Sequence, residues 1–234
     1  MIIMLRILQI VLCALANREG HGIISLDIIL APNKVSAHSM GACGHGNKIK
    51  RSGFMVYIFL ADGFEEIEGL TVVDLLRRAA IEIRMVSVTG RKQVESSHHI
   101  KIEADELFGE SDYSKADMLV LPGGNPGTSH LAEHQELVTL LKQFNQEGKN
   151  IAALCAAPSV LGLNGILQGK RATCFPGNEE YLTGAIFTGK KTETDANIIT
   201  GKGMGVSIDF SLCIIERLKD KATADKIAAA IQYI

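Results

Sequence analysis

One cysteine stands where a pattern typical of reactive thiols would place it. Cys155 has alanine two residues before it and two residues after it, at Ala153 and Ala157. An apolar run of strand type, 151–154, precedes the cysteine, and a run of helical type follows it. Small residues at both spacings suit a sharp strand-to-helix turn, because its backbone segments approach closely. The spacing therefore indicates a nucleophile elbow, with the thiol exposed at the end of a strand.

The position of this thiol would also affect its protonation. A helix N-terminus offers unpaired N–H groups and the positive end of the helix dipole, and both favour a thiolate. Pro158 suits the first helical turn, where its missing N–H would have had no partner. We therefore expect a lowered pKa for Cys155. The alternative is that Cys155 is a small buried apolar residue at a strand end.

Composition limits the classes of protein to which the chain can belong. The 234 residues are 47% hydrophobic, enough for one sizeable domain with a core. The net charge is −2 and the basic residues are scattered, so we expect no nucleic-acid partner. No apolar run reaches transmembrane length, so we expect no membrane association. Five cysteines at irregular spacings, without a C-x-x-C pair, favour free thiols and a cytoplasmic location.

The first part of the chain does not match the pattern of the rest. Residues 1–16 are apolar and end in Ala-Leu-Ala, which resembles a signal-peptide cleavage site, but they lack a basic beginning. Residues 31–53 are rich in Gly, Ser, His, Asn and Lys and show no clear period. We interpret 1–53 as an N-terminal extension outside a domain formed by 54–234, with Met55 as an alternative start. Processing at the Ala-Leu-Ala site would instead indicate export.

Strands and helices alternate along the rest of the chain. Continuous apolar runs predict buried strands, and amphipathic runs predict helices. The predicted strands are 55–61, 81–88, 117–121, 151–154, 171–174 and 196–200, with a more exposed strand pair over 94–104. The predicted helices are 65–80, 129–146, a short one ending near Leu163, 206–219 and 222–234. The alternation predicts an α/β fold with a doubly wound, mostly parallel sheet and helices on both faces.

These elements would bring three features to one edge of the sheet. Ligand crevices in such sheets lie at the carboxyl ends of the strands. Cys155 lies there at the elbow, and Gly123 and Gly124 come directly after a buried strand. Helical spacing extends the apolar face of 65–80 back to Glu68, which we therefore expect to point inward at the strand ends. Their meeting favours a functional site at Cys155.

The histidines do not predict a metal site. His130 and His134 are four residues apart on a predicted helix, but the glutamate of an H-E-x-x-H pattern is missing. His98 and His99 are adjacent on a predicted strand and would point to opposite faces. We expect neither a metal nor another cofactor.

Four motifs together resemble the ThiJ/PfpI superfamily, in the branch that contains the parkinsonism-associated deglycase and bacterial YajL. They are Ala-Asp-Gly-Phe-Glu-Glu-Ile-Glu at 61–68, Leu-Pro-Gly-Gly-Asn at 121–125, Ala-Leu-Cys-Ala-Ala-Pro at 153–158 and Gly-Met-Gly at 203–205. The likeness runs from about Met55 to the C-terminus. It implies a flavodoxin-like α/β sandwich that is usually a homodimer.

The resemblance also implies roles for individual residues. Cys155 matches the reactive cysteine of the family, and Glu68 matches the glutamate that hydrogen-bonds it. The backbone N–H groups of Gly124 and Ala156 match the oxyanion-binding pair. Two further positions that line the site correspond to Gly123 and Phe175.

Two departures from the wider superfamily concern histidine. PfpI-type peptidases carry a histidine directly after the cysteine, where this chain has Ala156. Many relatives place a histidine in the loop position that Phe175 occupies here, and no histidine follows His134. A Cys-His dyad therefore lacks its base, which argues against peptidase and amidotransferase chemistry.

The resemblance implies a cofactor-independent glyoxalase or deglycase that acts on a small reactive carbonyl through Cys155, with Glu68 as the general acid/base. The alternative is a redox-responsive stress protein or chaperone, in which Cys155 is oxidised to the sulfinate. A third interpretation is a small-molecule binding domain. Turnover of methylglyoxal separates the first from the other two.

Overall fold

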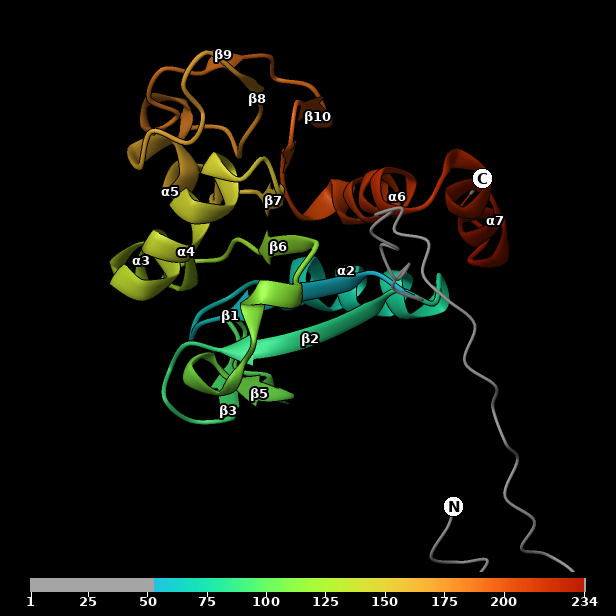
Figure 1. Cartoon of the computed structure of the whole chain (residues 1–234), viewed down its shortest axis with the longest axis horizontal. Coiled ribbons are helices and arrows are strands. Elements are labelled where there is room, and N and C mark those ends of the chain that lie inside the picture. The colour runs from blue at the N-terminus through green and yellow to red at the C-terminus, as the bar shows by residue number, and fades with distance from the viewer. Residues whose placement is uncertain (1–52, 234) are drawn as a thin grey trace, which may run out of the picture. The chain divides into compact units, whose positions relative to one another are not determined.

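The computed structural model describes residues 53–233, so the expected extension 1–53 lies outside the described residues except for Gly53. A seven-stranded sheet forms the centre of this part (Figure 1). Its strands are β1 (Met55–Leu60), β2 (Glu82–Ser87), β5 (Glu106–Leu107), β6 (Met118–Leu121), β7 (Asn150–Leu154), β10 (Thr192–Asp195) and β11 (Ile198–Gly201). They follow the order β10-β11-β7-β6-β1-β2-β5, and each described pair is parallel except β10 with β11.

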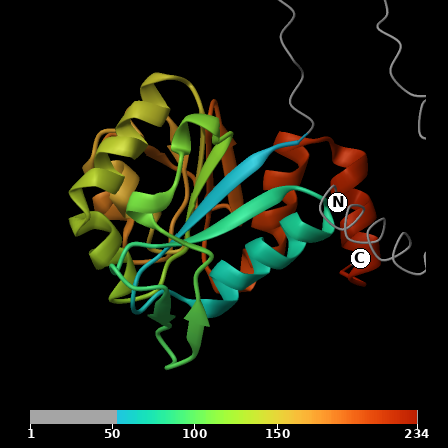
Figure 2. The same ribbon diagram turned by 60° about the horizontal axis from the view of Figure 1, so that its bottom comes forward.

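Helices cover both faces of the sheet (Figure 2). One face carries α2 (Glu66–Arg78), α6 (Ser207–Leu218) and α7 (Lys221–Ala230). The other face carries α3 (Gly127–Glu133), α4 (Gln135–Gln146) and α5 (Pro158–Leu163). The predicted α/β fold, a mostly parallel sheet between two layers of helices, is therefore confirmed. None of the helices in the described part combines the length and apolarity that crossing a membrane requires.

Side chains that alternate in direction along the central strands contribute to the apolar core on each face of the sheet. In β1, Ile58 and Leu60 pack in the cluster that includes α2 and α6, whereas Tyr57 and Phe59 pack in the cluster on the opposite face. Successive side chains of a strand point to opposite faces, so a strand covered on both faces must be apolar throughout. This explains why β1 is a continuous apolar run in the sequence.

The predicted helix 129–146 is two helices. His134 separates α3 from α4 with an extended backbone, and its Nδ1 accepts a hydrogen bond from the N–H of Leu137 at 3.1 Å. The imidazole thus caps α4 in the manner of an N-cap side chain. His130 and His134 do not lie on one continuous helix, so the metal-binding spacing considered for them does not exist.

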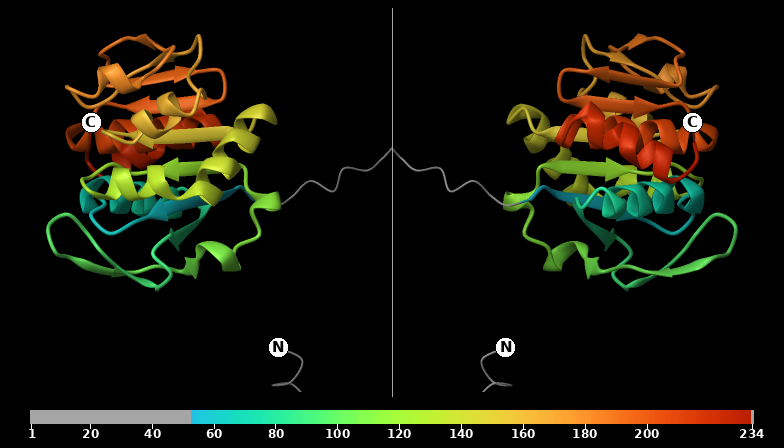
Figure 3. Two further views of the ribbon diagram at one scale, coloured as in Figure 1. Left: turned by 90° about the vertical axis from the view of Figure 1, so that its left-hand side faces the viewer. Right: turned by 90° about the vertical axis from the view of Figure 1, so that its right-hand side faces the viewer.

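Smaller strands differ from the predictions in ways that their composition explains. The pair expected over 94–104 is a hairpin of β3 (Gln93–Glu95) and β4 (Lys101–Glu103) that projects from the sheet (Figure 3). His98 and His99 lie in its turn, not on a strand as predicted. The edge strand β10 was not predicted because its sequence, Thr-Glu-Thr-Asp, is polar, as edge strands often are. The predicted strand 171–174 is β8 (Arg171–Ala172), which pairs with β9 (Ile186–Phe187) outside the main sheet.

Candidate active site

The turn at Cys155 has the backbone that a nucleophile elbow requires. Cys155 has a φ of 62°, in the left-handed region that few residues other than glycine adopt. Its N–H donates to the carbonyl of Gly201 at 2.9 Å, and its carbonyl accepts from the N–H of Phe175 at 2.7 Å. These two hydrogen bonds hold the strained residue between β11 and the loop after β8. The thiol is partly exposed at the carboxyl end of β7.

Glu68 lies in the first turn of α2 and points inward, as the helical spacing predicted. The residue is completely buried. Its Oε2 accepts a hydrogen bond from the N–H of Gly123 at 2.8 Å, whereas Oε1 is buried without a partner of good geometry in the described part of the chain. Glu65 Oε2 accepts from the N–H of Glu68 at 2.6 Å and caps the helix. The cap therefore fixes the turn that carries Glu68.

Gly123 packs against both the carboxyl of Glu68 and the Cβ of Cys155, and these two side chains lie close enough to interact directly. A Cβ atom at position 123 would lie 2.7 Å from Glu68 Oε2 and 2.6 Å from Cys155 Cβ, closer than side chains normally approach. Only a glycine lets the loop after β6 pass this close to both side chains. Tertiary structure thus brings Cys155, Glu68 and Gly123 into one site, as the sequence predicted.

Two backbone N–H groups lie at the sulfur of Cys155. They belong to Gly124 and Ala156, and both act as hydrogen-bond donors that favour the thiolate. Gly124 has a φ of 97°, and a side chain there would collide with the backbone of residues 63–65. This placement fits the oxyanion-binding role that the resemblance implies for the pair.

The protonation of Cys155 differs from the expectation. Burial raises the pKa of Glu68 to about 7, against the opposing hydrogen bonds from Cys155 and Gly123. Burial, and next the negative charge of Glu68, raise the pKa of the Cys155 thiol, which the N–H donors lower only in part. The expected lowered pKa of Cys155 is therefore wrong, because burial and a like charge outweigh the helix N-terminus. Near neutral pH, the Cys155 thiol and the Glu68 carboxyl therefore carry at least one proton between them.

Cys155 opens into a pocket of about 530 Å³. Its walls come from the loop after β6, from α3, from the elbow with α5, and from the segment that includes the short helix η3 (Glu179–Tyr181). Phe175 lines it, as expected, and among the described histidines none does. Leu163, Asn178 and Tyr181 also line the pocket. Their sequence positions did not predict this, because no residue type by itself marks a pocket wall.

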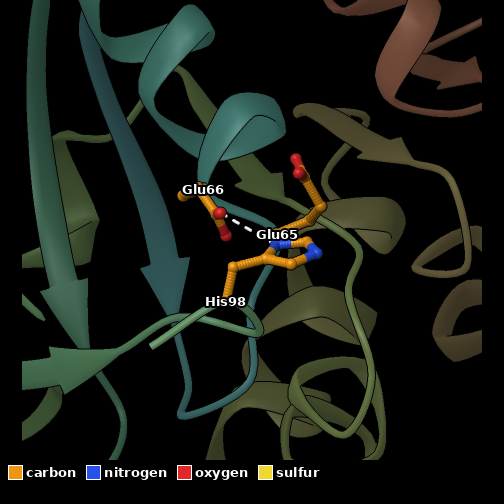
Figure 4. A group of neighbouring side chains, drawn as sticks. All are labelled: Glu65, Glu66 and His98. Atoms are coloured by element: carbon orange, nitrogen blue, oxygen red, sulfur yellow. Dashed lines mark ion pairs between the residues drawn. The ribbon is translucent and has the colours of Figure 1, made fainter. Parts of the chain in front are cut away.

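A second group of ionisable side chains lies at the start of α2 (Figure 4). His98 Nδ1 is 2.8 Å from Glu66 Oε1, and one potential ligand atom from each of Glu65, Glu66 and His98 lies within 4.8 Å of the others. These are residue types that bind metals. Both carboxylates already have structural partners, however, since Glu66 pairs with His98 and Glu65 caps the helix. We assign the group to stabilising the helix N-terminus, where negative charge is favourable.

Comparison with known proteins identifies the family and agrees with this fold. The model of the DJ-1/PfpI family matches residues 55–217. The chain belongs to the DJ-1/PfpI family. A solved structure of oxidized DJ-1 from Toxoplasma gondii is 32% identical and has a TM-score of 0.74, covering 77% of this chain and 98% of that one. The likeness confirms the flavodoxin-like α/β sandwich.

Relatives within the family differ in length and in described activity. The chain is 34% identical to protein DJ-1 homolog B of Arabidopsis thaliana over 204 residues, which cover 87% of this chain and 47% of that protein. It therefore spans about half the length of this relative, and the same holds for homolog A of the same plant. The chain is 31% identical to glutathione-independent glyoxalase DJR-1.2 of Caenorhabditis elegans over 157 residues, 66% of this chain and 83% of that protein.

Proposed function

We propose that this chain is a cofactor-independent, glyoxalase- or deglycase-like enzyme that acts on small α-oxoaldehydes such as methylglyoxal through Cys155. One observation carries the proposal: a partly exposed thiol, a buried carboxyl with a pKa of about 7 and two backbone N–H donors meet at one pocket. Isomerisation of an α-oxoaldehyde requires a nucleophile, a proton carrier and oxyanion donors. The relative named a glutathione-independent glyoxalase supports the same chemistry.

In the first step, the sulfur of Cys155 attacks the aldehyde carbon. The thiol proton passes to the Glu68 carboxylate as the S–C bond forms, and the carbonyl electron pair moves onto oxygen. The N–H groups of Gly124 and Ala156 stabilise this oxyanion. The oxyanion then takes the proton back from Glu68, giving a hemithioacetal. A carboxyl with a pKa of about 7 suits this exchange, because it accepts and returns a proton readily at neutral pH.

The second step moves hydrogen between neighbouring carbons. The Glu68 carboxylate removes the proton from the carbon bonded to sulfur, and the electron pair moves onto the adjacent carbonyl oxygen. That oxygen then takes the proton from Glu68, which gives an enediol and restores the carboxylate. Return of a proton to the adjacent carbon, with loss of the hydroxyl proton, gives a 2-hydroxy thioester. Water cleaves its C–S bond and releases the hydroxy acid and the thiol. One carbon is oxidised as its neighbour is reduced, so the reaction balances without an external oxidant or reductant.

Lactate formation from methylglyoxal, measured without glutathione, tests the proposal. Cys155→Ala should lower turnover at least about 100-fold, since the covalent route is lost. Cys213→Ala is the matched control, because Cys213 lies on α6 beside Thr192 and outside the pocket. Full activity in folded Cys155→Ala would rule out the covalent mechanism.

A redox-responsive role is the second candidate, and the histidine-free wall of the pocket favours it within the described residues. Two molecules of hydrogen peroxide would each transfer one oxygen to the sulfur of Cys155 and leave as water, giving a sulfinate. The two N–H donors at this sulfur could hold its oxygens. Gain of two oxygens at Cys155 by peptide mass spectrometry, in a chain without methylglyoxal turnover, would favour this role. If the chain shows neither methylglyoxal turnover nor oxidation of Cys155, the remaining interpretation is a small-molecule binding domain.

We also propose that the chain acts as a homodimer in the cytoplasm. The family resemblance supports the dimer, and the three free cysteines of the described part support a reducing compartment. Light scattering coupled to size-exclusion chromatography checks the oligomeric state, and fractionation of the native host checks the location.

A further inference from the structure

Three large apolar side chains on the wall of the Cys155 pocket are unusually exposed. Phe175 is 49% exposed, Tyr181 42% and Leu163 59%. All three line the pocket, although they come from different segments of the chain. Apolar surface gathered in a concave site is typically where a ligand binds, because filling the site removes that surface from water. This wall therefore favours a ligand with an apolar portion.

The rest of the pocket is uncharged. Within the described part of the chain, no Asp, Glu, Lys, Arg or His lines it. Its polar side chains are neutral amides and hydroxyls, from Asn125, Asn178, Ser129, Ser159 and Thr128. A charged group on a substrate would lose water here without gaining an opposite charge, which is unfavourable. The carboxyl of Glu68 lies beside the thiol of Cys155, and once it ionises it would repel an anionic substrate.

One hydroxyl of the pocket wall forms no hydrogen bond with the described residues. Thr128 is nine-tenths buried, and its Oγ1 has no hydrogen-bond partner among the described residues. Its N–H donates to the carbonyl of Gly124 at 2.9 Å, so Thr128 follows the loop whose N–H lies at the sulfur. This hydroxyl is neutral, so it offers no opposite charge to an ionised substrate group.

We propose that this pocket selects uncharged α-oxoaldehydes with an aromatic or branched apolar tail, of which phenylglyoxal is the simplest aromatic probe, and rejects charged carbonyl compounds. The inference rests on the proposed function. The tail lies against Phe175, Tyr181 and Leu163 while the aldehyde carbon meets Cys155. A volume of about 530 Å³ holds a ring in addition to the two-carbon head. Phenylglyoxal and water would give mandelate by the same isomerisation and thioester hydrolysis.

The first test compares kcat/KM for phenylglyoxal, methylglyoxal and 4-carboxyphenylglyoxal, which adds one negative charge to the same ring. Phenylglyoxal should exceed its carboxylated analogue at least about tenfold. Tyr181→Ala and Leu163→Ala should each lower, about tenfold, the kcat/KM for phenylglyoxal divided by the kcat/KM for methylglyoxal. Comparing this ratio between variant and wild type removes the effect of the intrinsic reactivity of the aldehydes. Ile186→Ala is the matched control, because Ile186 is 58% exposed but does not line the pocket.

Methylglyoxal turnover separates the selectivity of the pocket from the proposed function itself. Turnover of methylglyoxal with equal kcat/KM for the two ring compounds, or unchanged ratios in both variants, would overturn the inference alone. If no aldehyde is turned over, calorimetric binding to Cys155→Ala decides the question without chemistry. Tighter binding of phenylglyoxal than of 4-carboxyphenylglyoxal supports the neutral apolar pocket, and equal binding overturns it.

Discussion

At the scale of single residues, the proton held between Cys155 and Glu68 governs the site. The carboxyl titrates near pH 7, and its ionised form opposes ionisation of the thiol. Nucleophilic sulfur therefore forms as its proton moves to Glu68. The two residues act as one unit, so we expect the effects of their substitution to be far from additive.

Folding stability should depend on pH through Glu68. Its pKa is raised from 4.5 in the unfolded chain to about 7 in the fold. The resulting contribution to stability is fully present below about pH 4.5 and is lost as the pH rises to about 7, because only the unfolded chain ionises in that range. The loss amounts to about 3 kcal/mol. Glu68→Gln should flatten this part of the profile, measured by urea unfolding at about pH 4.5, 6 and 8.

The exposed glutamate Glu103 provides the control for this measurement. Glu103→Gln should keep the wild-type loss of stability between about pH 4.5 and 7. An undiminished slope in Glu68→Gln would contradict the raised pKa.

Phe175→His should raise methylglyoxal turnover about tenfold, because it adds a proton carrier at the thiol. A Cβ atom at Gly203 would lie 3.2 Å from Phe175 Cδ2 and 3.9 Å from Cys155 Sγ. The ring of Phe175 and the sulfur of Cys155 are therefore both close to Gly203. Phe175→Leu controls for loss of the ring. Turnover no higher in folded Phe175→His than in Phe175→Leu would show that proton transfer does not limit the rate.

At the scale of elements, the site depends on how closely the loop after β6 approaches the elbow after β7. Gly123→Ala should destabilise the fold by about 1–3 kcal/mol and reduce turnover, because its Cβ would push Glu68 and Cys155 apart. Gly205→Ala is the control, since a Cβ there meets open space. Thermal unfolding and methylglyoxal turnover report the two effects. Wild-type behaviour in both assays would mean that the loop has room to move.

At the scale of the whole molecule, we propose that residues 1–53 are dispensable for the domain. A chain that begins at Met55 keeps every element of the sheet and all the site residues. It loses the carbonyl of Phe54, which accepts from the N–H of Glu82 at 3.2 Å, and the partial packing of that side chain. A lost hydrogen bond of about 1 kcal/mol corresponds to a fall of about 2–4 °C in the thermal midpoint.

Comparison of chains that begin at Met1 and at Met55 tests this proposal. Oligomer size and methylglyoxal turnover should be equal. A much lower midpoint or loss of solubility in the shorter chain would show that 1–53 contributes to the fold.

The sequence alone determined the features that local patterns encode. Apolar runs such as β1 mark strands buried on both faces, since the side chains on each face of such a strand pack in an apolar core. Small residues around Cys155 mark the sharp turn, because larger ones would clash. Helical spacing placed Glu68 inward, because the period of a helix sets which side chains share a face.

Features that depend on residues distant in the chain became apparent only in the folded molecule. His134 ends one helix and caps the next, which the amphipathic pattern of 129–146 conceals. The pocket wall joins Leu163 to Tyr181 across separate elements, and no residue type marks such a wall in advance. The pKa of Cys155 rises because folding buries the thiol beside a carboxyl from a different helix. Burial and distance between charges determine a pKa, and both exist only once the chain has folded.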